Sequence, residues 1–192
     1  MSRVVGIAAL LAAAGALIYG RRFQTQLPVV EAIEPVEGQE LPYPPPSPPR
    51  AGRLSPSDVL ALLPQADPDG WMPPAYALAF VEVESGFNPN AYRFERHLNE
   101  ASYGLMQVLE STARDMGLQG PPEGMYDPAT SLRIGIAYSR WCWDFLSRRL
   151  GREPTETEWI GSYNAGVGNA LRGFTPHGYV RKWTLAKERY QL

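Results

Sequence analysis

Two glutamates, Glu82 and Glu84, stand two positions apart in the stretch VEVESGFNPNAY, and either could be a catalytic acid. The apolar run before them predicts a helix that ends at Gly86. A carboxyl group at such an end can protrude into a cleft while its stem stays among apolar side chains, and partial burial favours the neutral acid. An acid that stays protonated near neutral pH can donate a proton to a leaving group.

Helical periodicity alone does not choose between the two acids, because both fall on apolar faces of the predicted helix. The residues that follow favour Glu84, since it is the last helical position before Gly86 and Asn88-Pro89 turn the chain. Glu82 is expected to pair with an arginine or lysine or to face solvent. A buried structural carboxylate is the alternative interpretation for Glu84.

Helices are the elements expected to position this acid, because residues 54–192 show almost no alternating pattern of the kind that strands produce. Proline, glycine and capping residues mark where the helices begin and end. The sequence therefore predicts an all-α domain over residues 54–192. Its expected helices are a short one that stops at Pro64, one from Pro73-Pro74 to Gly86, one over 105–116, one over 131–150, one after a capping box at 155–158, and a last one from about Tyr179.

The first third of the chain has a different character. Residues 4–20 contain no charge and are bracketed by arginines, and as a helix they would be about 25 Å long. A cleaved signal peptide is the alternative, but the following residues make a poor cleavage site, so a retained membrane anchor within residues 1–22 is predicted. The proline-rich residues 23–53 predict an extended linker, with a ligand for an aromatic groove as the less favoured reading.

Composition excludes several classes of function. With Lys+Arg 18 against Asp+Glu 20, the chain lacks the basic excess that nucleic-acid binding requires. The single cysteine, Cys142, cannot form an intramolecular disulfide and is expected to be a small buried apolar residue. One cysteine and two histidines, His97 and His177, give no credible metal site, and no cofactor is expected.

Three segments in order carry a more specific signal. They are Glu84-Ser85-Gly86 with the asparagine and proline after it, ASYGLMQV at residues 101–108, and Tyr163-Asn164-Ala165-Gly166. Together they resemble the lysozyme-like lytic transglycosylases of the soluble-transglycosylase type, whose signatures are an ES pair, a GLMQ segment and a YNAG segment. The resemblance covers about residues 70–185, and so includes neither the anchor nor the linker.

The resemblance implies a lysozyme-like helical fold and peptidoglycan glycan strands as the binding partner. Enzymes of that family cleave the β-1,4 bond between N-acetylmuramic acid and N-acetylglucosamine. Glu84 would be the single acid/base: it would protonate the glycosidic oxygen and then deprotonate the muramic 6-hydroxyl, which closes a 1,6-anhydro ring. No second carboxylate is needed, unlike in most glycosidases.

Further substrate contacts are implied for matched residues around the acid. A structural role is an equal alternative for Gln107, which is expected to start a helix, and a place in the core is the alternative for Met106. Tyr179 matches a terminal YV segment, and a hydrophobic contact at a helix start is its alternative. The implied substrate-binding residues are Ser102, Met106, Gln107, Tyr163, Asn164 and Tyr179.

The sequence also departs from the family pattern. Residues 92–100 form a longer and more charged insertion before GLMQ, and Glu95, Glu100 and His97 could approach the site. A second carboxylate there could position water, so a hydrolytic muramidase is one alternative function and a catalytically silent peptidoglycan-binding module is another. Ser131 stands where an asparagine is usual, which puts that hydrogen bond in doubt but not the fold.

The anchor and the substrate together predict a location in the bacterial cell envelope, with the catalytic domain facing peptidoglycan. Local wall opening there would suit an envelope-spanning secretion or conjugation machine. It would equally suit a virion that makes an entry hole.

Overall fold

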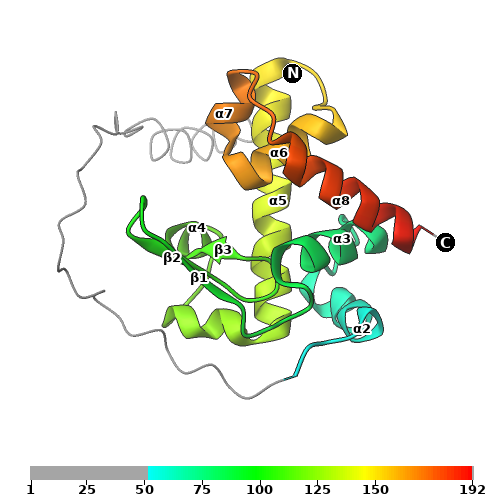
Figure 1. Ribbon diagram of the computed structural model, residues 1–192, viewed down its shortest axis with the longest axis vertical. Helices are drawn as coiled ribbons and strands as arrows, with labels where there is room; N and C mark the ends of the chain where they lie inside the picture. The colour runs from blue at the N-terminus through cyan, green and yellow to red at the C-terminus, as the bar shows by residue number, and fades with distance from the viewer. Residues whose placement is uncertain (1–51, 192) are drawn as a thin grey trace, which may run out of the picture. The chain divides into compact units, whose positions relative to one another are not determined.

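The computed structural model describes residues 52–191 (Figure 1). The predicted anchor, residues 4–20, and nearly all of the predicted linker lie outside the described residues. Among residues 52–191, no helix is both long enough and apolar enough to cross a membrane.

A long central helix organises the described part of the chain. This helix, α5 (Pro128–Leu150), runs through the middle of Figure 1, with a small sheet on one side and the helices α3 and α8 on the other. The remaining elements, in chain order, are α2 (Pro56–Ala66), α3 (Pro74–Ser85), β1 (Tyr92–Glu95), β2 (Glu100–Tyr103), β3 (Val108–Leu109), α4 (Glu110–Asp115), the 3-10 helix η1 (Pro122–Tyr126), α6 (Glu156–Ala165), α7 (Val167–Leu171) and α8 (His177–Tyr190).

The predicted helix boundaries that rest on caps agree with the structure. At the start of α6 the predicted capping box is present: the Thr155 hydroxyl accepts from the backbone N–H of Glu158, and the Glu158 carboxylate accepts from the backbone N–H of Thr155. Ser55 and Asp58 form the same arrangement at the start of α2, a capping box that was not predicted. Helices α3 and α5 end at Gly86 and Gly151, which both adopt the left-handed conformation that glycine allows. Pro64 does not end α2 as predicted, because the helix continues to Ala66.

The prediction of an all-α domain is wrong in one place, because the chain contains a three-stranded antiparallel sheet in the order β1-β2-β3. Tyr92 pairs with Tyr103, so most of the predicted insertion is a β-hairpin. The helix predicted over 105–116 is also shorter than expected: only α4 is helical, because Gly104 and Gln107 have positive φ angles of 72° and 46° that no helix accepts.

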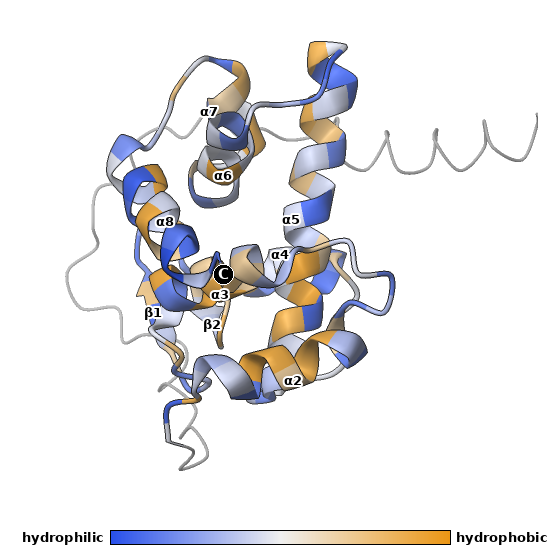
Figure 2. Ribbon diagram, turned by 90° about the vertical axis from the view of Figure 1, so that its right-hand side faces the viewer, coloured by the Kyte–Doolittle hydropathy of each residue, from blue (hydrophilic) through white to orange (hydrophobic). Residues whose placement is uncertain are grey.

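The hydrophobic core lies where α3 meets α5, α6 and α8. The ring centroid of Phe80 lies 4.7 Å from that of Tyr163 and 5.4 Å from that of Trp183, and both Phe80 and Trp183 are fully buried. Figure 2 shows apolar residues gathered where α2, α3 and the first half of α5 come together. This packing fixes the end of α3, and with it Glu84.

Cys142 is fully buried in the same core, and burial raises the pKa of its thiol to about 12. The thiol therefore stays neutral, and the prediction of a small buried apolar residue is confirmed.

Candidate active site

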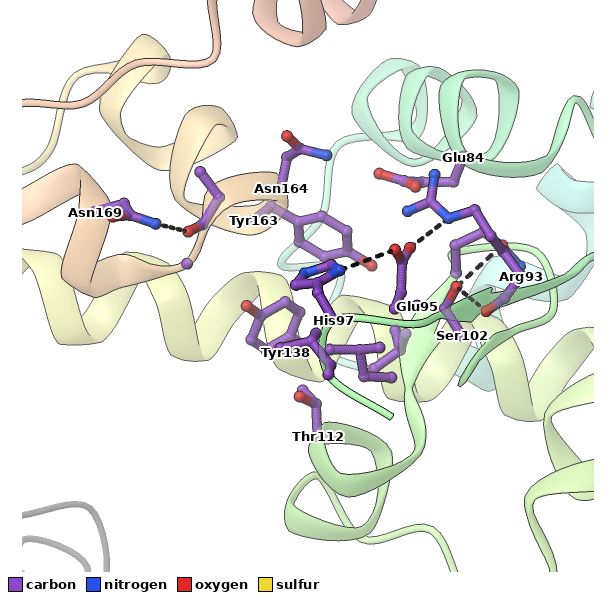
Figure 3. A pocket seen from close by; sticks show the side chains of 16 residues that line it. Glu84, Arg93, Glu95, His97, Ser102, Thr112, Tyr138, Tyr163, Asn164 and Asn169 are labelled. Atoms are coloured by element: carbon purple, nitrogen blue, oxygen red, sulfur yellow. Dashed lines mark hydrogen bonds and ion pairs between the residues drawn. The ribbon is translucent and has the colours of Figure 1, made fainter. Parts of the chain in front are cut away.

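A pocket of about 430 Å³ opens between the sheet and the helices α3, α5 and α6 (Figure 3). Each wall comes from a different part of the chain, so the pocket exists only in the folded protein. Its polar and aromatic lining residues include Glu84 from α3, Arg93, Glu95 and His97 from the β1–β2 hairpin, Ser102, Gln107 and Thr112 from the sheet and α4, Tyr138 from α5, and Tyr163, Asn164 and Asn169 from α6 and α7.

Glu84 is half-buried at the C-terminal end of α3, and its carboxylate points into the pocket (Figure 3). The chain turns immediately after it because Gly86 takes φ 57°, and Arg53 donates a hydrogen bond to the Gly86 carbonyl oxygen at 2.6 Å. The structure therefore places Glu84 where the turn residues predicted it.

The pKa of Glu84 is raised to about 7, because burial disfavours the charged carboxylate more than its neighbours stabilise it. The hydroxyl of Tyr179 donates a hydrogen bond to Oε1 of Glu84 at 2.5 Å, and this bond lowers the pKa. The positive charge of Arg93 lowers it further. Near neutral pH the carboxyl group thus populates both its protonated and its ionised form, as an acid that later acts as a base requires.

Glu82 is engaged elsewhere. It forms an ion pair with Arg189 and accepts a hydrogen bond from the hydroxyl of Tyr190 at 2.5 Å, both from the last turns of α8. It does not line the pocket. The prediction that Glu82 pairs with a basic residue is confirmed.

Two tyrosines form the aromatic floor of the pocket. Tyr163 donates a hydrogen bond from its hydroxyl to the carbonyl oxygen of Met106 at 2.8 Å, and its ring lies 5.0 Å from that of Tyr138. Burial raises the pKa of both hydroxyls well above the usual value, so both remain neutral. The sequence predicted Tyr163 but missed Tyr138, because its helix had the apolar pattern of a core element.

Ser102 and Gln107 form a hydrogen-bonded wall below Glu84. The Gln107 side-chain amide donates to the carbonyl oxygens of Ala91 at 3.1 Å and Gly104 at 3.0 Å, and its oxygen accepts from the Ser102 hydroxyl at 3.2 Å. The side chain thereby ties the chain before the hairpin to the turn after it. Both residues also line the pocket, so the structural and the binding roles considered for Gln107 are compatible.

Three other residues predicted to bind substrate lie in three different environments. Asn164 is exposed and lines the pocket. Tyr179 reaches the site through Glu84. Met106 differs from the prediction: it is fully buried, and a Cβ atom added at Gly135 would lie 2.5 Å from its Cβ. Its side chain packs in the core and does not reach a ligand in the pocket.

The hairpin brings one of its two predicted acids to the site. Glu95 lines the pocket and forms an ion pair with Arg93 at 2.5 Å, and His97 lies 3.9 Å from it. Glu100 does not line the pocket, because its carboxylate accepts a hydrogen bond from the backbone N–H of Ser111 at the start of α4. Glu95 is thus the acid of the insertion that faces Glu84.

Ser131 is fully buried at the start of α5, where its hydroxyl accepts a long hydrogen bond of 3.5 Å from the backbone N–H of Met106. Ser131 therefore links the start of α5 to the GLMQ segment.

Within residues 52–191, no cluster of three or more histidine, cysteine, aspartate or glutamate side chains has the arrangement of a metal site.

Comparisons with known proteins agree with this geometry. The family described as transglycosylase SLT domain matches residues 65–185. A membrane-bound lytic murein transglycosylase C from Mannheimia succiniciproducens is 32% identical over 126 residues, which is 60% of this chain and 33% of that protein. The chain therefore spans about a third of the length of this curated relative.

A solved structure shares the fold. The 70 kDa soluble lytic transglycosylase from Escherichia coli matches with a TM-score of 0.53 and 22% identity, over 68% of this chain and 23% of that chain. The predicted lysozyme-like fold is thus confirmed, whereas the domain predicted to be all-α is mostly helical with a three-stranded sheet. The resemblance drawn from three short segments is confirmed over nearly the same residues, and the chain belongs to the transglycosylase SLT domain family.

Proposed function

We propose that this chain is a peptidoglycan lytic transglycosylase, which cleaves the β-1,4 bond between N-acetylmuramic acid and N-acetylglucosamine with Glu84 as its only acid/base. The observation that carries the proposal is the half-buried Glu84 carboxyl group in the pocket, whose pKa is about 7. The Mannheimia relative supports the substrate class, because it is a lytic murein transglycosylase.

The first step needs protonated Glu84. Its proton passes to the glycosidic oxygen, the bond from the anomeric carbon to that oxygen breaks, and positive charge develops on the sugar. Because the Tyr179 hydroxyl donates to Oε1, Oε2 is the oxygen free to carry the transferred proton.

The second step uses the carboxylate that remains. Oε2 accepts the proton of the muramic 6-hydroxyl while the 6-oxygen bonds to the anomeric carbon, which closes a 1,6-anhydro ring. Glu84 is thereby reprotonated, so the cycle balances without water.

The pocket walls supply groups that suit a glycan. The ring of Tyr138 offers an apolar face for a sugar, and the amide of Asn164 can bond hydroxyl and N-acetyl groups. Ser102 and Gln107 complete the opposite wall, but the Ser102 hydroxyl already donates to Gln107, and the Gln107 amide already donates to the carbonyl oxygens of Ala91 and Gly104. We assign Ser102, Gln107, Tyr163 and Asn164 to substrate binding and Tyr179 to the positioning of Glu84.

A hydrolytic muramidase is a second candidate, favoured by the presence of Glu95 in the pocket. A carboxylate that activates water must be free to accept its proton. Glu95 is instead engaged by Arg93, whose Nε lies 2.5 Å from Oε1 of Glu95. For this reason we rank hydrolysis second.

We further propose that residues 4–20 anchor the enzyme in a membrane and that residues 23–53 act as a spacer, so that cleavage is confined to peptidoglycan within reach. The Mannheimia relative is described as a membrane-bound enzyme, which supports this setting. Such confinement suits local wall opening around an envelope-spanning machine or by a virion.

A pair of isosteric substitutions tests the proposed function. Glu84→Gln should abolish release of soluble fragments from purified sacculi while the variant still sediments with them. Glu82→Gln is the matched control on the same helix and should retain most of the release, because Glu82 faces α8 and not the pocket. Equal release by Glu84→Gln and wild type would leave a binding module as the better account.

A further inference from the structure

The β1–β2 hairpin presents a row of charged side chains to the pocket. Arg93 and Glu95 lie two positions apart on β1 and therefore share a face of the strand, and His97 follows in the turn of the hairpin. All three line the pocket, whereas the intervening Arg96 does not.

Arg93 is the member of the row that acts on Glu84. In Figure 3 its guanidinium lies beside the Glu84 carboxylate, and its positive charge favours the ionised form of Glu84. Its partner on the strand is Glu95, at 2.5 Å. The exposed fractions differ: 66% for the Arg93 side chain and 20% for Glu95, so Arg93 keeps the freedom to move between the two carboxylates.

We propose that Arg93 is a positioning residue of this active site, which stabilises Glu84 as a carboxylate between the two steps of the reaction, and that Glu95 limits the strength of this effect. The catalytic role of Arg93 rests on the proposed function. Its electrostatic effect on Glu84 is inferred from the arrangement of Arg93, Glu95 and Glu84 and does not depend on that function.

The two steps of the reaction set opposite requirements. An unopposed arginine would hold Glu84 ionised and remove the proton needed for the first step, whereas a site without it would leave the carboxylate of the second step unstabilised. The Arg93–Glu95 pair meets both requirements, because Glu95 neutralises most of the charge at the start and Arg93 can turn toward Glu84 once it ionises.

Other groups facing Glu84 do not supply this charge. The hydroxyls of Tyr179 from α8, Tyr163 from α6 and Tyr138 from α5 stay neutral, because burial raises the pKa of each well above its usual value. His97 lies on the far side of Glu95, at 3.9 Å from it, and adds positive charge only when protonated.

Two readouts on the full chain in non-ionic detergent test the proposal. The first is the titration of the Glu84 side-chain carboxyl by NMR with 13C-labelled glutamate, its signal identified by its absence from Glu84→Gln. The second is the pH dependence of fragment release, whose alkaline limb follows the loss of the Glu84 proton. Neither readout should respond to a purely structural role of an exposed arginine.

The expected results have opposite signs for the two partners. Arg93→Gln should move the Glu84 titration and the alkaline limb to higher pH by roughly half a pH unit, less than for a buried pair because Arg93 is largely exposed. Glu95→Gln should move both to lower pH, and Arg93→Lys should stay near wild type. The matched controls, Arg96→Gln and Glu153→Gln, change the same charges at exposed positions outside the pocket and should leave both unchanged.

An unchanged Glu84 titration in Arg93→Gln, or a shift no larger than in Arg96→Gln, would overturn the proposal. The NMR readout keeps this outcome separate from the fate of the proposed function. If wild type released no fragments, the function would fail, while the titration would still report whether Arg93 acts on Glu84.

Discussion

Tyr179 donates a hydrogen bond of 2.5 Å to Glu84 across 95 positions of the chain. Further along α8, Lys187 binds both carboxylate oxygens of Glu156 at 2.7 Å, and Arg189 pairs with Glu82, the neighbour of Glu84 on α3. Contacts near the C-terminal end of α8 therefore hold this helix in place, and its first turn brings Tyr179 to Glu84. It belongs to the site as much as α3 does.

Replacing Tyr179 by phenylalanine should slow fragment release by roughly 10- to 150-fold, because a hydrogen bond to a charged group contributes about 1.5–3 kcal/mol. The pKa of Glu84 should rise, since the bond favours the carboxylate. The measurement is the rate of release from sacculi as a function of pH. Tyr190→Phe, which removes a hydroxyl bonded to Glu82, is the control and should retain activity; equal losses in both variants would show that only the docking of α8 matters.

Glu84 should make stability depend on pH. Its folded pKa of about 7 lies above the value of 4.5 for a free glutamate, so the folded state binds the proton more tightly than the unfolded state. The resulting stability is fully present below pH 4.5 and is lost as pH rises through about 7, by at most about 3 kcal/mol. Glu84→Gln should thus be more stable than wild type at pH 8, relative to pH 4.5, in urea unfolding. The same pH dependence in both proteins would contradict the raised pKa.

Gly104 should tolerate no side chain. It has φ 72°, and an added Cβ would collide with the carbonyl oxygen of Met125 and lie 2.5 Å from Oγ of Ser131. At Gly70 φ is 63°, and no atom lies within 4 Å of an added Cβ, so a substitution there measures the cost of the backbone conformation alone. We expect Gly70→Ala to lower the free energy of unfolding by about 1 kcal/mol and Gly104→Ala by more than about 3 kcal/mol. Similar losses in urea unfolding would mean that the contact with η1 and α5 relaxes easily.

A chain that begins at Arg53 should be soluble and active on isolated sacculi. It lacks the uncharged run of residues 4–20 but retains the residues matched by the family and the Arg53 bond to the turn after Glu84. Solubility without detergent and the rate of fragment release are the measurements. Loss of release with an unchanged helical circular dichroism spectrum would give the linker a role beyond reach.

The sequence predicts what local chemistry determines. Glu84 could be chosen over Glu82 because Gly86 and Asn88 indicate a turn directly after it. In the same way, the capping box at Thr155 indicates where α6 begins. These signals act over a few residues and hold whatever the rest of the chain does.

What the sequence misses depends on contacts between distant segments. The strands of the sheet have four, four and two residues, too short for a readable alternation. Tyr138 shares its apolar spacing with core residues, and only the packing of α5 against Tyr163 places it in the pocket. Met106 sits in a recognisable motif, but a motif does not say which way a side chain points, and here it points toward Gly135.

The end group of the released fragments distinguishes ring closure by the 6-hydroxyl from attack by water. Purified sacculi would be digested with the full chain, with Glu84→Gln and with Glu95→Gln, and the soluble fragments analysed by mass spectrometry. If Glu84 is the only acid/base, we expect fragments that end in 1,6-anhydromuramic acid from wild type and Glu95→Gln, and none from Glu84→Gln. Fragments that end in reducing muramic acid, and that disappear with Glu95→Gln, would show that water attacks and that this chain is a hydrolase.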